Sequence, residues 1–164
     1  MRRIAFLQKT DKYSGAENIV ITIMKLLPKE KYDCIYVSLD GGIREVVEAE
    51  GLKFYAMPNA HMKSVKAAIE HVKPDIIHAT DYGMSSYAAM LHTGIPVVAH
   101  LHNNVPWLQN PLDPKNLFFA LALPLISQVI SVSPSIEDEF VYRNLLKNKN
   151  HVIYNVVDLS LIHI

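Results

Sequence analysis

The sequence predicts an α/β fold: a doubly wound, mainly parallel sheet of seven strands with helices on both faces, of the Rossmann-like kind. Apolar runs and stretches with helical spacing alternate along the whole chain, as they do in right-handed βαβ units. The apolar runs mostly lack polar alternation, which is typical of strands covered on both faces. The chain has 164 residues, half of them hydrophobic, which fits one domain with a large buried core.

The strands are expected in the apolar runs, taken in chain order. These runs are 2–8, 33–39, 53–57, 75–79, 96–101, 128–132 and 151–154. Proline and glycine separate them from the helices: Lys73-Pro74 ends one helix and begins a strand, and Gly94 to Pro96 does the same for the next unit.

Three of the intervening stretches carry apolar stripes at helical spacing, each of which would pack on the sheet. The stripes are Ile19, Ile23, Met24 and Leu27 in the first, Met62, Val65, Ile69 and Val72 in the second, and Ile136 with Phe140 in the third.

Composition excludes several classes of function. The 16 basic residues balance 16 acidic ones, so no overall field attracts nucleic acid or an anionic membrane, and any anion site must be local. Cys34 is the single cysteine, so no internal disulfide can form, which suits a reducing compartment. A cytoplasmic location is expected on this ground.

Ligands of an open parallel sheet collect beyond the carboxyl ends of its strands. The segment Lys9 to Gly15 follows the first strand and leads into a helix, whose free N–H groups favour phosphate. Neither a G-x-x-x-x-G-K loop nor a G-x-G-x-x-G fingerprint is present, so neither a P-loop NTPase nor a standard dinucleotide site is supported. Two interpretations stay open: phosphate binding, or a plain helix cap by Ser14.

Three histidines fall at the ends of neighbouring strands, namely His78, His100 and His102. Because residues two apart on a strand share a face, His100 and His102 could form a metal pair with His78, but no Cys, Asp or Glu at suitable spacing completes a shell. Hydrogen bonding at a cleft is the favoured role, beside a purely structural one.

The longest irregular segment runs from Asn103 to Asp113 and contains Trp107. Loops of this length in compact domains are often functional, so Trp107 is expected to bind a sugar or a lipid surface, with a core position as the alternative. Asp81 follows the fourth strand, where helix capping is favoured over ligand contact.

Together these residues resemble the amino-terminal, acceptor-side domain of family 4 glycosyltransferases of the GT-B architecture. The matching pieces occur in the family's order across nearly the whole chain. They are Ser14-Gly15-Ala16-Glu17, Lys73-Pro74-Asp75-Ile76-Ile77-His78-Ala79, Gly94-Ile95-Pro96-Val97-Val98 with Leu101-His102-Asn103, Val129-Ile130-Ser131-Val132-Ser133, and Val152-Ile153-Tyr154-Asn155-Val156-Val157-Asp158.

The resemblance implies a retaining transfer of a sugar from a nucleotide-sugar donor, with no metal or other cofactor. It implies that Ser14 and Gly15 lie near the donor diphosphate and that His102 is the catalytic residue, approaching a hydroxyl of the transferred sugar. The acceptor would be a glycan, a lipid or a small molecule. Its expected contacts are Glu17, His78, Asp81, Asn103 and Trp107.

The resemblance also implies a division of the chain: 1–158 as the Rossmann-like domain, and 159–164 as a tail or the start of a carboxy-terminal nucleotide-binding domain. That domain would be the main partner, and this half alone would be inactive. The sequence departs from the family at Ser14, where a glycine is usual, and at Val156 in the expected hinge.

Further expected contacts are a peripheral one at the inner face of the membrane and a homo-oligomer formed through the exposed cleft face. Two other functions stay open beside the transferase. One is a non-catalytic, flavodoxin-like module that binds a small anionic ligand or a protein partner. The other, least favoured, is a metal-dependent hydrolase built on the three histidines.

Overall fold

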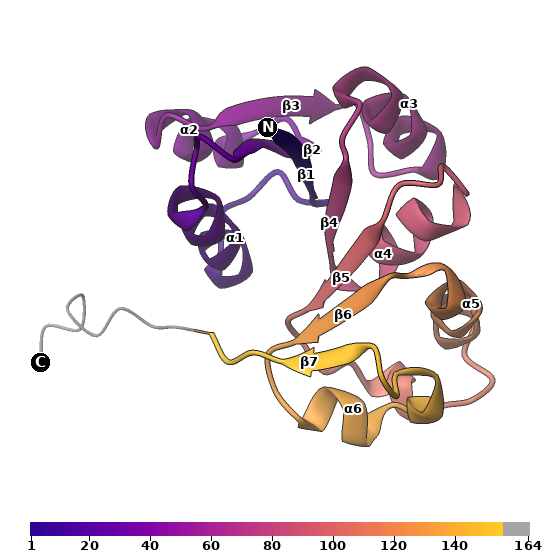
Figure 1. The fold of residues 1–164 in the computed structure, drawn as a ribbon. Coiled ribbons are helices and arrows are strands. Elements are labelled where there is room, and N and C mark those ends of the chain that lie inside the picture. Colours follow the sequence, from indigo (N-terminus) through magenta and orange to yellow (C-terminus); the bar gives the residue numbers. More distant parts are fainter. Residues whose placement is uncertain (156–164) are drawn as a thin grey trace, which may run out of the picture.

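The structure of the chain is a computed structural model that describes residues 1–155 (Figure 1). The predicted hinge residues Val156 to Asp158, the domain boundary at 158 and the predicted tail 159–164 lie outside the described residues. Within residues 1–155, no helix is both long and apolar enough to cross a lipid bilayer.

The fold class is confirmed, and the sheet is parallel throughout. Its seven strands lie in the order β3-β2-β1-β4-β5-β6-β7. Each predicted strand is present, with ends that differ from the prediction by no more than two residues. The strands are β1 (Arg2–Leu7), β2 (Tyr32–Leu39), β3 (Lys53–Met57), β4 (Ile76–Thr80), β5 (Val97–Leu101), β6 (Gln128–Ser131) and β7 (Asn150–Val152).

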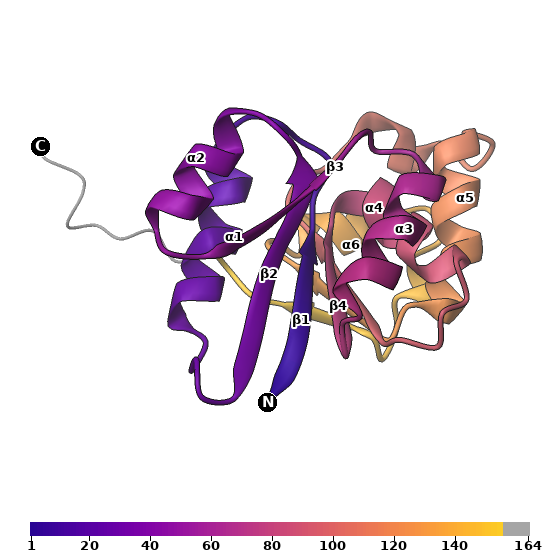
Figure 2. The same cartoon turned by 90° about the horizontal axis from the view of Figure 1, so that it is seen from above.

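Helices cover both faces of the sheet. Helices α1 and α2 lie on one face, and α3, α4 and α5 lie on the other (Figure 2). The α-helices are α1 (Gly15–Leu26), α2 (Gly42–Ala49), α3 (Met62–Val72), α4 (Asp81–Met90), α5 (Pro114–Ala122) and α6 (Ser135–Glu139), and the short 3₁₀ helices are η1 (Pro106–Gln109), η2 (Leu123–Leu125) and η3 (Arg143–Leu145).

The buried face of α1 differs from the predicted stripe. Val20, Ile21 and Met24 are buried, whereas Ile19 and Ile23 are only partly covered. The segment from 19 to 24 is apolar on nearly every side, so spacing alone could not select the face that packs. Leu27 was expected inside the stripe, but it follows the helix in an extended conformation.

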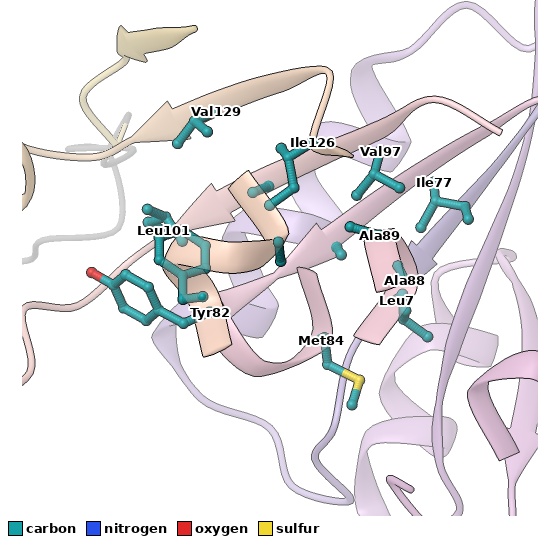
Figure 3. Packing of buried hydrophobic residues seen from close by; sticks show 14 of the residues in the cluster. Leu7, Ile77, Tyr82, Met84, Ala88, Ala89, Val97, Leu101, Ile126 and Val129 are labelled. Carbon is teal, nitrogen blue, oxygen red and sulfur yellow. The ribbon is translucent and has the colours of Figure 1, made fainter. Parts of the chain in front are cut away.

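The larger part of the core lies between the sheet and α4. Small residues of that helix, Ala88 and Ala89, face β-strand residues such as Leu7, Ile77 and Val97 (Figure 3). The small alanines let the helix approach the sheet closely, while Tyr82 and Met84 fill the wider space near its first turn. As a result α4 is fixed against the strand ends that carry the candidate site.

The core on the opposite face contains one unpaired polar atom. Tyr36 is fully buried between β2, α1 and α2, and its hydroxyl has no hydrogen-bond partner within the described residues. Burial and the nearby Glu17 charge raise the pKa of this hydroxyl well above its usual range, so it stays protonated. A buried donor without an acceptor weakens the folded state.

We therefore expect Tyr36→Phe to raise the free energy of unfolding by about 1 kcal/mol, because it removes the unpaired hydroxyl and keeps the ring. The matched control is Tyr82→Phe, since the Tyr82 hydroxyl donates to the Asn103 carbonyl at 3.0 Å. The free energy of unfolding of that variant should fall by about 1 kcal/mol, because a hydrogen bond is lost. Urea denaturation measures both, and a loss of stability in Tyr36→Phe equal to that in Tyr82→Phe would contradict the expectation.

Candidate functional site

The sheet changes direction between β1 and β4, which are neighbours in space although β2 and β3 intervene in the chain. From β1 the chain turns to α1 on one face, and from β4 it turns to α4 on the other. The chain therefore leaves the carboxyl ends of these two neighbouring strands toward opposite faces of the sheet. In open parallel sheets this is the point at which a crevice forms. The side-chain amide of Gln8, at the end of β1, donates to the hydroxyl of Thr80 at the end of β4 and joins the two edges.

The loop from Lys9 to Ser14 forms one side of this crevice and is held against the start of α2. The Ser38 hydroxyl donates to the Thr10 carbonyl, and the Ile43 N–H donates to the Asp11 carbonyl at 3.0 Å. A Cβ on Gly41 would lie only 2.8 Å from the Asp11 carbonyl oxygen, so this close packing requires glycine. The position of the α1 N-terminus is thus set by α2.

The first turn of α1 has free backbone donors. Ser14 occupies the N-cap position, and its hydroxyl donates to the Glu17 carboxylate but accepts no hydrogen bond from a backbone N–H, so a side-chain cap by Ser14 is absent. The first N–H to bond back is that of Asn18, which donates to the Ser14 carbonyl at 3.0 Å. In the described part of the chain, the N–H groups of Gly15, Ala16 and Glu17 have no protein partner. Such groups attract an anion.

The three histidines form a row across the ends of β4 and β5. His78 Nε2 lies 3.0 Å from His100 Nδ1, and the rings of His100 and His102 are 4.0 Å apart between centroids. Among residues 1–155, no three His, Cys, Asp or Glu side chains are arranged to hold one metal ion.

The row is electrically neutral near pH 7. Burial, with a smaller contribution from His102 and His78, lowers the pKa of His100 to about 2. Burial followed by the influence of His102 lowers the pKa of His78 to about 4. Both rings can therefore share a hydrogen bond without mutual charge repulsion.

His102 is the member of the row that faces charged groups. Burial lowers its pKa, while the carboxylates of Asp81 and Glu17 act in the opposite direction. Both of its ring nitrogens are buried and have no hydrogen-bond partner within the described residues. A neutral imidazole with two unused nitrogens can accept a hydrogen bond from one ligand group and donate to another.

Asp81 has an unusual backbone conformation. It is the first residue of α4 and has φ of 64°, in the left-handed region that costs a non-glycine residue about 1–2 kcal/mol. In the described structure its carboxylate caps nothing, and the N-cap position belongs to Thr80, so the favoured capping interpretation is wrong. Burial raises the pKa of Asp81, while the charges of Lys9 and His102 lower it.

A cavity of about 470 Å³ opens beside Asp81. Its apolar walls are mainly aromatic, and its polar groups lie at strand ends and at the start of α5. The lining side chains that matter most here are Tyr82, Tyr87, Trp107, Phe118, Lys9, Asp81, Asn103 and Lys115.

The segment Asn103–Asp113 forms one wall of the cavity and is held in place by buried polar contacts. The amide of Asn116, itself fully buried on α5, donates to the carbonyls of Trp107, Leu108 and Asn110 at 2.8–3.1 Å. Trp107 is partly buried and meets the Tyr82 ring edge to face at 5.0 Å. Its indole thus packs on the core, as the alternative prediction had it, and also lines the cavity. Its contact with a sugar or a lipid surface stays a prediction.

The predicted site residues fall into two groups. Asp81, Asn103 and Trp107 line the cavity. The other five do not line it. Ser14, Gly15 and Glu17 lie at the start of α1, whereas His78 lies on β4 and His102 directly follows β5. The two groups meet at Asp81, whose pKa responds to both His102 and Glu17.

Sequence reasoning missed several residues of the cavity. Lys9 carried a usable signal, because it follows a strand end as Asp81 does. Tyr82 directly follows Asp81 at the predicted helix entry, where a ligand contact was considered. The cavity positions of Tyr87, Lys115 and Phe118 had no such signal, since they depend on how α4 and α5 pack together.

Fold and crevice together define a Rossmann-like α/β domain with its binding edge at a switch point. The sequence profile of Glycosyltransferase Family 4 matches residues 13–161, and the chain belongs to this family. It is an amino-terminal domain of that family's type. No curated protein sequence matches the chain in a direct sequence comparison.

Several solved structures share the fold. HepE of Anabaena, in complex with UDP-glucose, superimposes with a TM-score of 0.76 at 22% identity, over 98% of this chain and 45% of HepE. A glycosyltransferase of Rickettsia africae superimposes with a TM-score of 0.73 at 16% identity, over 97% of this chain and 44% of that protein. UDP-GlcNAc 2-epimerase of Neisseria meningitidis, bound to UDP-GlcNAc, superimposes with a TM-score of 0.65 at 14% identity, over 93% of this chain and 47% of the epimerase. The chain spans less than half the length of each.

The neutral histidine row leads to a prediction about pH. Below pH 6.5 an unfolded His100 binds a proton that the folded residue, with its pKa of about 2, does not bind. Stability should therefore fall as the pH decreases from about 6.5, by up to about 1.4 kcal/mol per pH unit for each such histidine.

His100→Asn should reduce the slope of the unfolding free energy against pH by up to about 1.4 kcal/mol per pH unit, which corresponds to one bound proton fewer in the unfolded state. Denaturation in urea between neutral and mildly acidic pH measures the slope, with His71→Asn, on the exposed surface of α3, as the control. An unchanged slope in His100→Asn would show that His100 is protonated in the folded state.

Proposed function

We propose that this domain is the acceptor-binding half of a retaining glycosyltransferase, which transfers a sugar from a nucleotide-sugar donor to an acceptor held in the cavity beside Asp81. The observation that carries the proposal is the junction of two different environments at one strand edge. A turn with three free N–H groups and a neutral histidine lies on one side, and an aromatic cavity lies on the other. Family membership supports the reaction class.

The donor diphosphate would approach the first turn of α1. Free N–H groups and the helix dipole favour phosphate there. A Cβ on Gly15 would meet no atom within 4 Å, so the backbone is open at this point. Ser14, in place of the family's glycine, turns its hydroxyl to Glu17 and leaves that opening clear.

His102 would contact the transferred sugar. Its two nitrogens, unpaired in the described structure, provide a donor and an acceptor for a sugar hydroxyl, and the His100 ring packs against it at 4.0 Å between centroids. A hydrogen bond that strengthens as charge develops at the sugar would accelerate transfer. Protein groups alone provide these contacts, so the proposal requires no metal or other cofactor.

The acceptor would lie against Trp107 and Tyr82, with polar contacts from Asp81 and Asn103. Aromatic rings suit the apolar faces of sugars and lipids alike. Glu17 and His78 lie outside the cavity walls, so in this proposal they support the site and do not touch the acceptor directly.

Under this proposal the domain needs a carboxy-terminal nucleotide-binding partner for turnover. HepE and the Rickettsia africae enzyme, which are similar in fold, are more than twice as long as the matched region. The similar fold of the epimerases does not indicate the reaction of this chain, because likeness in fold alone does not fix a reaction. A cytoplasmic location fits a nucleotide-sugar substrate and is proposed with it.

The first test uses His102→Ala in the chain mixed with a separately expressed donor-binding domain, assayed for sugar transfer from a series of nucleotide sugars. We expect kcat to fall about 10²–10³-fold, because a hydrogen bond to the reacting sugar is lost. His71→Ala, on exposed α3, is the matched control and should retain full activity. Equal activity of the two variants would remove His102 from the mechanism.

The second test separates phosphate binding from a structural role for the α1 turn. Gly15→Ala should leave stability unchanged or raise it by about 0.4–1 kcal/mol, because the added methyl meets no atom and restricts the unfolded chain. It should nevertheless weaken donor binding, measured by calorimetry with the nucleotide sugar, since the methyl occupies space that the phosphate needs. Undiminished donor affinity in Gly15→Ala would contradict a phosphate at this turn.

A further inference from the structure

Asn116 is a polar residue at a position where an apolar one is expected. It lies in the first turn of α5, on the side that faces the core with Phe119 and Ala122, and it is fully buried. The Cα–Cβ bonds of a helix tilt toward its N-terminus, so a side chain in the first turn reaches back to the chain that precedes the helix. Here the preceding chain is the segment Asn103–Asp113, which forms one wall of the cavity.

Three carbonyl groups of this segment converge on the Asn116 side chain. They belong to Trp107, Leu108 and Asn110, at the end of η1. Only a group that donates suits this position, because a carbonyl oxygen cannot bond to another acceptor. The amide nitrogen of Asn116 therefore faces the carbonyls. Its side-chain oxygen is buried and has no hydrogen-bond partner within residues 1–155.

The unpaired oxygen indicates that stability alone does not explain this asparagine. A buried acceptor without a donor costs free energy. The three carbonyls do not depend on Asn116 for their pairing, since each also accepts a backbone N–H, from Asn110, Val141 and Asp113 respectively. A leucine of nearly the same shape would fill the space without an unpaired oxygen. The amide thus adds orientation to a segment whose backbone is already paired.

Trp107 is the cavity residue whose position Asn116 fixes most directly. The amide donates to the Trp107 carbonyl at 3.1 Å, and the Trp107 indole meets the Tyr82 ring at 5.0 Å. The Tyr82 ring packs in turn on Phe119, which lies one helical turn after Asn116. Both the backbone and the indole of Trp107 are therefore held in place from α5.

The two ends of the segment have separate anchors. The Tyr82 hydroxyl donates to the Asn103 carbonyl at 3.0 Å, and the Tyr142 hydroxyl donates to the Pro111 carbonyl at 2.7 Å. These bonds restrain the ends, whereas Asn116 restrains the middle of the segment, where the indole lies.

We propose that Asn116 is a positioning residue for the acceptor: it acts through the Asn103–Asp113 segment and keeps Trp107 at the depth in the cavity at which the acceptor stacks on the indole. This inference rests on the proposed function and adds to it a residue that does not touch the acceptor. An aromatic ring held in its binding orientation before the ligand arrives need not be ordered on binding. If only a fraction of the molecules had the wall in that arrangement, the apparent affinity for the acceptor would fall by that fraction.

The first measurement uses the fluorescence of Trp107, which is the single tryptophan of the chain. Asn116→Leu keeps the volume of the side chain and removes both donated hydrogens. Acrylamide should quench Trp107 about twofold more strongly in this variant, because the segment opens locally more often. The free energy of unfolding, measured in urea, should stay close to that of the unmodified chain, because the variant also removes the unpaired oxygen.

Lys149→Met is the matched control. The Lys149 ammonium also donates to three carbonyls, but these follow the other end of α5. They belong to Leu123, Pro124 and Ile126, at 2.8–3.2 Å. The control should lower the free energy of unfolding and leave the quenching of Trp107 unchanged, because it loosens the fold away from the cavity wall.

The second measurement is sugar transfer in the same mixture of domains that tests His102. Asn116→Leu should raise the KM for the acceptor roughly fivefold and leave kcat and the KM for the donor unchanged, because only the population of the acceptor-binding wall falls. Lys149→Met should match the unmodified chain in all three constants.

Two results would overturn the inference. One is quenching of Trp107 in Asn116→Leu that is no stronger than in Lys149→Met. The other is a fall in kcat in place of the rise in the acceptor KM. Absence of transfer by the unmodified mixture would instead count against the proposed function, and the fluorescence of the chain alone would still decide whether Asn116 positions Trp107.

Discussion

The whole site depends on one constraint of the sheet: every strand is parallel, and the order reverses between β1 and β4. Parallel strands bring seven carboxyl ends to one edge, and the reversal sends α1 and α4 to opposite faces there. The crevice is thus a consequence of chain topology, and no side chain is needed to open it. The bond from Gln8 to Thr80 keeps the two diverging edges at a fixed separation, so residues on α1 and α4 can act on one ligand.

The candidate site reduces the stability of the fold at several points. His100 is buried and neutral, Asp81 holds a left-handed backbone conformation, and both ring nitrogens of His102 lack partners in the described structure. Each feature costs free energy that an apolar or small residue would not. They gather at one strand edge, while the sheet beneath them is packed with aliphatic side chains. Such local cost is typical of a site prepared for a ligand.

The sequence predicted what depends on local pattern. All seven strands were found because both-face burial leaves uninterrupted apolar runs, and Asp81 and His102 were found because strand ends are readable. The stripe on α1 was right for Met24 and missed Val20 and Ile21, since Val20 and Ile23 are equally apolar. Ser14 does occupy the N-cap, but its hydroxyl donates to Glu17 and accepts nothing from the backbone. The cavity wall formed by Tyr87 and Phe118 could not be predicted from the sequence, because only the packing of α4 on α5 brings these rings together.

Asp81 connects the two halves of the proposed chemistry. It lines the cavity, yet its pKa responds to His102 and Glu17 in the crevice, so it lies within electrostatic reach of both. A sugar transfer requires the acceptor hydroxyl to meet the donor at one carbon atom, and a carboxylate at that junction can accept the hydroxyl's proton or orient it. Its raised pKa makes it a better proton acceptor than an exposed carboxylate, while Lys9 beside it keeps the ionised form accessible.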